Sequence, residues 1–345
     1  MHDATTPITA KTAYESLKAA GYPRIYVEKL LPEWWDNSLL RTSAGTFQFA
    51  MILKQRLGLD VSFGQDGELS ISAAAPRARF KRRSGTQEDE LNIAANLGTA
   101  LGGLAIHCAA SPYSRPPSDP LEIRAMILQR SGKDHVDFEG LLDLCWVSGI
   151  PVLFLKEMPR NTKRMTGMAV AIAGRPAIIL GFNHSQHSKQ LFVLAHEVAH
   201  IICGHVGDDG VLIDEDLAEV NDGLQGGSVV RKDAEETEAD GFALALIRNG
   251  ITNPLRSFAR PTSAATLASS AMMLGKSLGI DPGHLVLSYA KENDDWARAN
   301  QALNFLPQRL GAIQLLEEKF LAHTGLSALS EENQEYILSV QGFSG

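Results

Sequence analysis

A His-Glu-x-x-His motif occupies residues 196–200, within the largely apolar run 191–202. Residues four apart in a helix lie on one face, one turn from each other. The imidazoles of His196 and His200 can therefore meet at one metal ion, with Glu197 beside it as a candidate general base. The alternative is a helix with two solvated histidines. The apolar flanks disfavour that alternative, because they indicate a buried helix in which unpartnered polar groups are costly.

A third ligand is expected downstream, because catalytic zinc usually takes three protein ligands and leaves one position for water. The acidic start of residues 235–246 suits the N-terminus of a second helix. Glu236 and Asp240 share one face of this helix. Glu236 can then bind the metal while Asp240 accepts a hydrogen bond from the outer N–H of a ligand histidine. Glu235 and Glu238 are rival ligands, and for each glutamate the alternative is a solvated helix start.

Between the two helices lie His205 and an acidic stretch, residues 206–230, with seven acidic residues, five glycines and no Lys or Arg. His205 is a candidate auxiliary residue that could stabilise an oxyanion. The alternative is a histidine at a helix C-terminus, favoured there by the helix dipole. A loop as long as the acidic stretch is usually functional or disordered. It could cover a cleft or select a basic substrate segment, or it could be a solvated insert.

Three parts of the chain resemble the ImmA/IrrE metallopeptidase domain, and together they span roughly residues 135–250. The resemblance implies that His196, His200 and Glu236 bind one Zn²⁺ ion. It also implies that Glu197 is the general base and that a strand pair precedes the zinc helix. The matching stretches are Gly167–Ile172 with Pro176–Leu180, Phe192–His200, and Glu236-x-Glu238-Ala239-Asp240-x-Phe242-Ala243.

Members of this family are single-zinc proteases or protease-like regulators, and the best understood cleave a helix-turn-helix repressor after DNA damage or another stress. The resemblance therefore implies a protein substrate of repressor or antitoxin type, in a bacterium or a mobile element. The chain departs from the family pattern at 244–249, after the second helix, and in the long connection between the two helices. These departures concern substrate and specificity more than the metal site.

The whole chain is expected to be α+β and mostly helical. A small β-sheet would pack on the zinc-binding helix pair in a zincin-like arrangement, between helical N- and C-terminal domains. The Pro- and Ser-rich residues 111–120 mark one boundary. We expect a helical N-terminal domain at 1–110, which could bind DNA or a partner, the metallopeptidase domain at 121–250, and a helical C-terminal domain at 251–345.

In the central part, strands are expected at 149–155 and in a hairpin of 167–173 and 177–181. The edge of such a sheet, beside the zinc helix, could bind a substrate as an added strand. Residues 1–83 are expected to be mostly helical. Further helices are expected at 90–110, 122–131, 137–148, 263–278, 309–323 and 331–341.

Composition narrows the class of protein. A hydrophobic fraction of 44% supports real cores, and a net charge of -8 argues against a protein that coats nucleic acid. The segment Arg77–Arg83 holds five basic residues, so it could make a weak contact to phosphates or be a solvated linker. Three cysteines without paired spacing suggest a reducing compartment. With no signal peptide or membrane-spanning run, a cytoplasmic location is expected.

Two functions from different classes follow from these observations. The first is a zinc-dependent metallo-endopeptidase that cleaves a partner regulatory protein, a repressor or antitoxin, in a bacterial stress or mobile-element response. The second is a non-proteolytic transcriptional regulator or partner-binding protein with a structural or sensing zinc site. Glu197 favours the enzyme, because a purely structural zinc has no need for a base.

Overall fold

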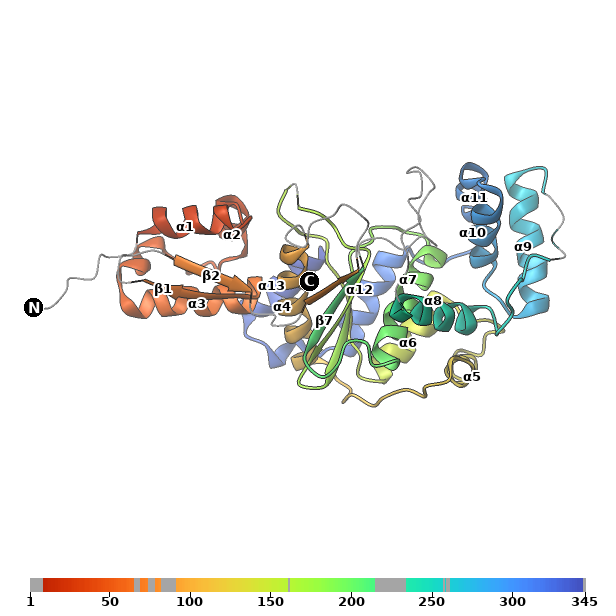
Figure 1. Ribbon diagram of the computed structural model, residues 1–345, viewed down its shortest axis with the longest axis horizontal. Coiled ribbons are helices and arrows are strands. Elements are labelled where there is room, and N and C mark those ends of the chain that lie inside the picture. Colours follow the sequence, from red (N-terminus) through yellow and green to blue (C-terminus); the bar gives the residue numbers. More distant parts are fainter. Residues whose placement is uncertain are drawn as a thin grey trace, which may run out of the picture.

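The computed structural model describes residues 9–64, 69–73, 78–81, 91–160, 162–214, 234–256, 258 and 261–343. Within these residues the protein is α+β and mostly helical, as expected, with thirteen α-helices and seven strands. Figure 1 shows an elongated molecule in which a central body built around a sheet lies between an N-terminal unit and a group of helices at the opposite end. In the described part of the chain, no helix combines the length and the apolar character needed to cross a membrane.

The described part of the N-terminal unit is mostly helical, as expected for residues 1–83, but it also contains two strands that were not predicted. A two-stranded antiparallel sheet follows its helices, and alternating apolar residues such as Leu59, Val61 and Phe63 carry the strand pattern. Gly58 ends the last helix with a φ of 64°, and its backbone approaches Asn96 closely. The elements are α1 (Ala10–Ala19), α2 (Arg24–Leu30), the 3₁₀ helix η1 (Asn37–Arg41), α3 (Ser43–Leu57), β1 (Leu59–Phe63) and β2 (Leu69–Ala73).

The central sheet has five strands in the order β3-β7-β5-β6-β4. The expected hairpin is present, with a turn at Ala173 and Gly174, which have φ of 50° and 72°. Two strands were not expected. One lies in the acidic stretch and pairs with the hairpin, and the other lies in the basic segment Arg77–Arg83, whose side chains are outside the described residues. The strands are β3 (Ala78–Lys81), β4 (Val152–Phe154), β5 (Gly167–Ile172), β6 (Arg175–Leu180) and β7 (Gly210–Asp214).

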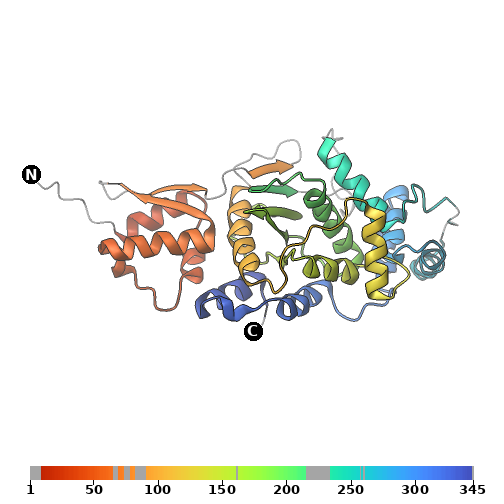
Figure 2. The same ribbon diagram turned by 90° about the horizontal axis from the view of Figure 1, so that it is seen from below.

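Helices cover both faces of this sheet, as Figure 2 shows. Adjacent residues of a strand point to opposite faces. Gly98 of α4 approaches the side chain of Met168, whereas Gly167 approaches Glu197 of α7, so α4 and α7 lie on opposite faces of β5. The helices of this body are α4 (Asn92–Cys108), α5 (Pro120–Ser131), α6 (Phe138–Val147), α7 (His187–Ile202) and α8 (Ala234–Ile247).

The buried side chains form two hydrophobic clusters. The larger runs from Ala13 to Phe343 and joins the N-terminal unit, the sheet and the last two helices. The smaller lies within 255–303. The segment 251–345, expected as one domain, therefore contributes to two cores. Its elements are α9 (Ala264–Leu278), α10 (Pro282–Asn293), α11 (Trp296–Leu303), α12 (Ala312–His323), the 3₁₀ helix η3 (Leu326–Ala328) and α13 (Glu331–Gln341).

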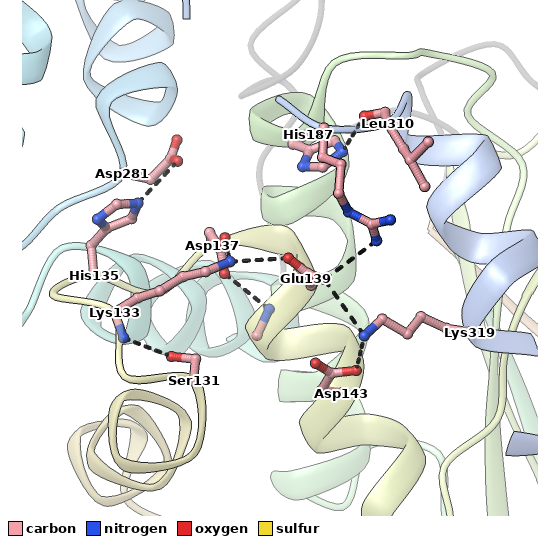
Figure 3. Close-up of polar contacts among 12 residues, drawn as sticks. Ser131, Lys133, His135, Asp137, Glu139, Asp143, His187, Asp281, Leu310 and Lys319 are labelled. Atoms are coloured by element: carbon pink, nitrogen blue, oxygen red, sulfur yellow. Dashed lines mark hydrogen bonds and ion pairs between the residues drawn. The ribbon is translucent and has the colours of Figure 1, made fainter. Parts of the chain in front are cut away.

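A polar network fixes the start of α7, far along the helix from the His-Glu-x-x-His motif (Figure 3). His187 Nε2 lies 2.9 Å from the carbonyl oxygen of Leu310, and Lys133 Nζ lies 3.1 Å from a carboxylate oxygen of Glu139. These four residues line a cavity of about 210 Å³. The segment before α12 therefore contacts both the start of α7, through Leu310, and α6, where Glu139 lies 3.9 Å from Arg309.

Candidate metal centre

Three elements bring four potential ligands to one point. α7 supplies His196 and His200, β7 supplies Asp214, and α8 supplies Glu236, and one ligand atom from each lies within 4.8 Å of all the others. The two Nε2 atoms are 2.9 Å apart. The carboxylate of Glu236 lies 3.5 Å from His196 Nε2 and 3.4 Å from His200 Nε2. Asp214 Oδ2 lies 3.5 Å and 3.6 Å from the same two atoms.

These distances fit a bound cation. Metal–ligand bonds of about 2.0–2.1 Å in tetrahedral geometry separate the ligand atoms by about 3.3 Å. Asp214 is 1% exposed, and within the described residues neither of its carboxylate oxygens has a hydrogen-bond partner. Burying a carboxylate without a counter-charge costs several kcal/mol, in order of magnitude. The cluster is therefore compatible with a metal ion, which would compensate this charge.

The outer nitrogens of both histidines face further polar groups. His196 Nδ1 lies 3.0 Å from Asp240 Oδ1, so the structure brings these two residues together. His200 Nδ1 lies 2.8 Å from His205 Nδ1, and His205 Nε2 lies 3.1 Å from Glu238 Oε2. His205 is thus behind His200, on the side away from the cluster. That position suits a residue that orients a ligand, rather than one that faces an oxyanion.

Glu197 lies on the other side of the cluster, against β5. It is completely buried, and within the described residues neither carboxyl oxygen has a hydrogen-bond partner. A Cβ atom at Gly167 would lie only 2.0 Å from Glu197 Oε1, so this glycine is needed to leave room for the carboxyl group. Asp214 is paired directly opposite Gly167 in the sheet. The absent side chain at Gly167 therefore makes space for Glu197 beside the residue that pairs with Asp214.

The pKa values of the centre reflect this crowding. Burial by itself lowers the pKa of His196, but the surrounding carboxyl groups outweigh it and raise that pKa well above its usual value. Burial raises the pKa of Glu197 well above its usual value, and the neighbouring Asp214 raises it further. Burial also acts to raise the pKa of Asp214, but the close approach of His196 and the charges of both histidines lower it. In this arrangement Asp214 carries the negative charge and Glu197 favours its protonated form.

Asp214 was not predicted as a ligand. Its residue number falls in the acidic stretch 206–230, which was expected to be a loop, yet three consecutive apolar residues, 211–213, precede it. Such a short apolar run is the signal of a buried strand, and it could have been recognised. The rival Glu238 contacts His205 instead of the four-residue cluster, and its side chain is 63% exposed. Glu235 is not part of the cluster either.

No protein-family model matches this chain, and no curated protein matches it. The resemblance to the ImmA/IrrE domain therefore stays a prediction from the motif residues. The donor set and its burial come from the geometry alone, and they are compatible with a metal ion irrespective of family.

Proposed function

We propose that this protein is a zinc-dependent endopeptidase of the ImmA/IrrE type, with a zincin-like catalytic body. The observation that carries the proposal is the position of Glu197. Its fully buried carboxyl group lies next to the point where His196 and His200 converge. A metal that only stabilises a fold needs no protonatable group at that position, whereas a hydrolytic site does.

Zinc is the favoured ion because its usual ligands are imidazole nitrogens and carboxylate oxygens in tetrahedral geometry. His196, His200 and Glu236 would hold it. When bound, the ion would polarise a peptide carbonyl and lower the pKa of water toward neutrality. Asp240 and His205 would hold the two histidine rings in orientation through their outer nitrogens.

Glu197 would act as the proton carrier. It would accept a proton from the attacking water and deliver it to the leaving amine nitrogen. Its burial keeps bulk water away from the proton that it carries between these two steps. No other protonatable group of the described residues is needed for this scheme.

A protein substrate fits the rest of the molecule. Large apolar side chains are exposed on the N-terminal unit, among them Phe47 at 67% and Met51 at 51%, one turn apart on α3. Such an apolar strip suits a contact with another protein. We propose a helix-turn-helix repressor or antitoxin as the substrate, in a stress or mobile-element response, on the resemblance of the motifs to the family.

The alternative is a non-proteolytic regulator with a structural or sensing zinc site. One observation favours it. Structural zinc sites have four protein ligands and no open position, and four residues converge here. The two proposals differ in what they require of Glu197, because only the enzyme needs its proton.

The first test is Glu197→Gln, which keeps the shape of the side chain and removes the base. We expect this variant to bind as much zinc as the wild type and to lose metal-dependent cleavage of a substrate found among the products of the neighbouring genes by about 10²- to 10⁴-fold. Glu122→Gln is the matched control, because this glutamate is exposed on α5, outside the metal centre, and should leave cleavage unchanged. Cleavage by Glu197→Gln at the wild-type rate would contradict the proposed role.

A further inference from the structure

Asp214 and Glu197 point into the same space. In an antiparallel pair, residues directly opposite each other have side chains on the same face of the sheet. Asp214 is opposite Gly167 in the sheet. The space that a side chain at Gly167 would take is occupied by the carboxyl group of Glu197. Asp214 therefore extends from β7 toward Glu197, and its Oδ2 atom reaches within 3.6 Å of the Nε2 atoms of both histidines.

This position is the one that a hydrolytic site keeps for water. Catalytic zinc sites have three protein ligands and one open position, and closed sites have four. With His196, His200 and Glu236 as three ligands, Asp214 supplies the fourth donor. It also stands beside Glu197, where a water molecule would have to lie in order to give up its proton. The centre therefore has four potential protein ligands, as a structural zinc site does. It also contains Glu197, the general base that only a catalytic site needs.

The backbone of β7 also lies where a peptidase would bind the backbone of its substrate, along β5. β5 pairs with β6 along one edge and with β7 along the other. The amide of Thr166, just before β5, donates a hydrogen bond of 2.7 Å to the carbonyl oxygen of Asp214. An extended peptide commonly binds to an exposed strand edge by adding a strand. Along β5 that edge is taken by residues 210–214 of the chain itself.

We propose that Asp214 is a fourth protein ligand of the metal, and that β7 occupies the place of a peptide substrate on β5. The arrangement is then latent, and it becomes active when β7, together with β3 on its other side, separates from β5 and removes Asp214 from the centre. This inference rests on the proposed peptidase function, and it adds to that function a means by which the site is kept closed. It reconciles the four converging ligands with the presence of Glu197.

The test uses the full-length protein loaded with Co²⁺, whose visible spectrum reports changes in coordination. Acetohydroxamate, a small chelating probe, is added to the wild type, to Asp214→Asn and to Asp208→Ala. Asp208 is an exposed acid just before β7, so its variant is the matched control. We expect the probe to change the spectrum of Asp214→Asn and to leave the other two unchanged. Asp214→Ala serves the same purpose if the asparagine variant does not fold.

A wild-type spectrum that responds to the probe at the same concentration as Asp214→Asn would overturn the inference, because the site would already be open. Cleavage of the substrate is then measured in the same proteins, with and without chelator. If Asp214→Asn binds the probe but does not cleave, the latent site stands and the peptidase proposal fails. If the wild type binds the probe and cleaves as fast as Asp214→Asn, the peptidase stands and the latent site fails.

Discussion

His196 and His284 are both buried histidines in helices, yet their surroundings give them opposite properties. His196 faces carboxyl groups of Asp214, Asp240 and Glu236, which raise its pKa well above the usual value against the effect of burial. His284, in α10, is 3% exposed, and Arg248 Nε donates a hydrogen bond of 2.8 Å to its Nε2 atom. Burial, followed by the charges of Arg248 and Lys291, lowers the pKa of His284 to about 3.

The difference shows that the neighbours, and not burial alone, make a buried histidine a metal ligand. At His284 the surrounding charges are positive and the ring accepts a hydrogen bond, so a cation would be repelled. Arg248 also donates to Ser288 Oγ at 3.1 Å, and the cluster joins the end of α8 to α10. At His196 the charges are negative and converge on one point. The first cluster holds helices together, and the second can bind an ion.

Removing each histidine should separate these roles most clearly. His196→Ala should abolish binding of one equivalent of zinc, because it deletes a ligand atom from the centre. His284→Ala should keep the full equivalent and lower the free energy of unfolding by about 1–3 kcal/mol, because Arg248 Nε loses its acceptor. Metal analysis and urea unfolding of both variants measure the contrast. Full zinc content in His196→Ala would break the comparison.

One glycine allows close packing beside the metal centre and another allows it beside His284. Replacing them should give the next largest difference between the two regions. A Cβ at Gly167 would lie 2.0 Å from Glu197 Oε1, and one at Gly283 would lie 1.7 Å from Ser188 Oγ. Gly167→Ala should displace the Glu197 carboxyl group, keep zinc, and reduce cleavage of the substrate by about 10²- to 10⁴-fold, as loss of a general base does. Gly283→Ala should lower stability and leave cleavage per folded molecule unchanged. Normal cleavage by Gly167→Ala would show that Glu197 is not constrained by β5.

The sequence predicted the parts of the site that lie on single helices, and missed the part that depends on strand pairing. Four-residue spacing placed His196 with His200, and it set Asp240 on the face of Glu236. Asp214 reaches the centre only because β7 pairs with β5, and no local pattern specifies that partner. β3 was missed for the same reason, since its parallel pairing joins β7 to residues far away in the sequence. The β5–β6 hairpin was found because its turn is local.

Replacing the polar groups that contact His196 and His284 should have smaller effects on zinc binding, and the two effects should differ. Asp240→Ala removes the acceptor near His196 Nδ1 and should weaken zinc binding by about 10- to 100-fold. Ser288→Ala removes a hydroxyl group beside His284 and should leave zinc binding unchanged. Zinc titrations against a competing chelator measure both affinities. Equal affinity of Asp240→Ala and the wild type would mean that the orientation of His196 does not depend on this carboxylate.

The smallest expected effect is the pH dependence of the metal-free protein, in which the two histidines act with opposite sign. The raised pKa of folded His196 means that the folded state holds more protons above pH 6.5, so stability is lost as pH rises through the raised pKa. The lowered pKa of His284 means that the unfolded state holds more protons below pH 6.5, so stability is lost as pH falls toward 3. Each group contributes a slope of at most about 1.4 kcal/mol per pH unit.

Urea unfolding of the chelator-treated protein between about pH 5 and 8 tests this, a range that avoids most protonation of carboxylates and ionisation of thiols. We expect His196→Gln to flatten the loss of stability above pH 6.5 and His284→Gln to flatten the loss below it. The raised pKa of Glu197 acts in the same direction as that of His196, so some slope should remain in the first variant. If His196→Gln instead changes only the acid side, its carboxylate neighbours do not control its proton. The contrast between the two buried histidines would then be wrong.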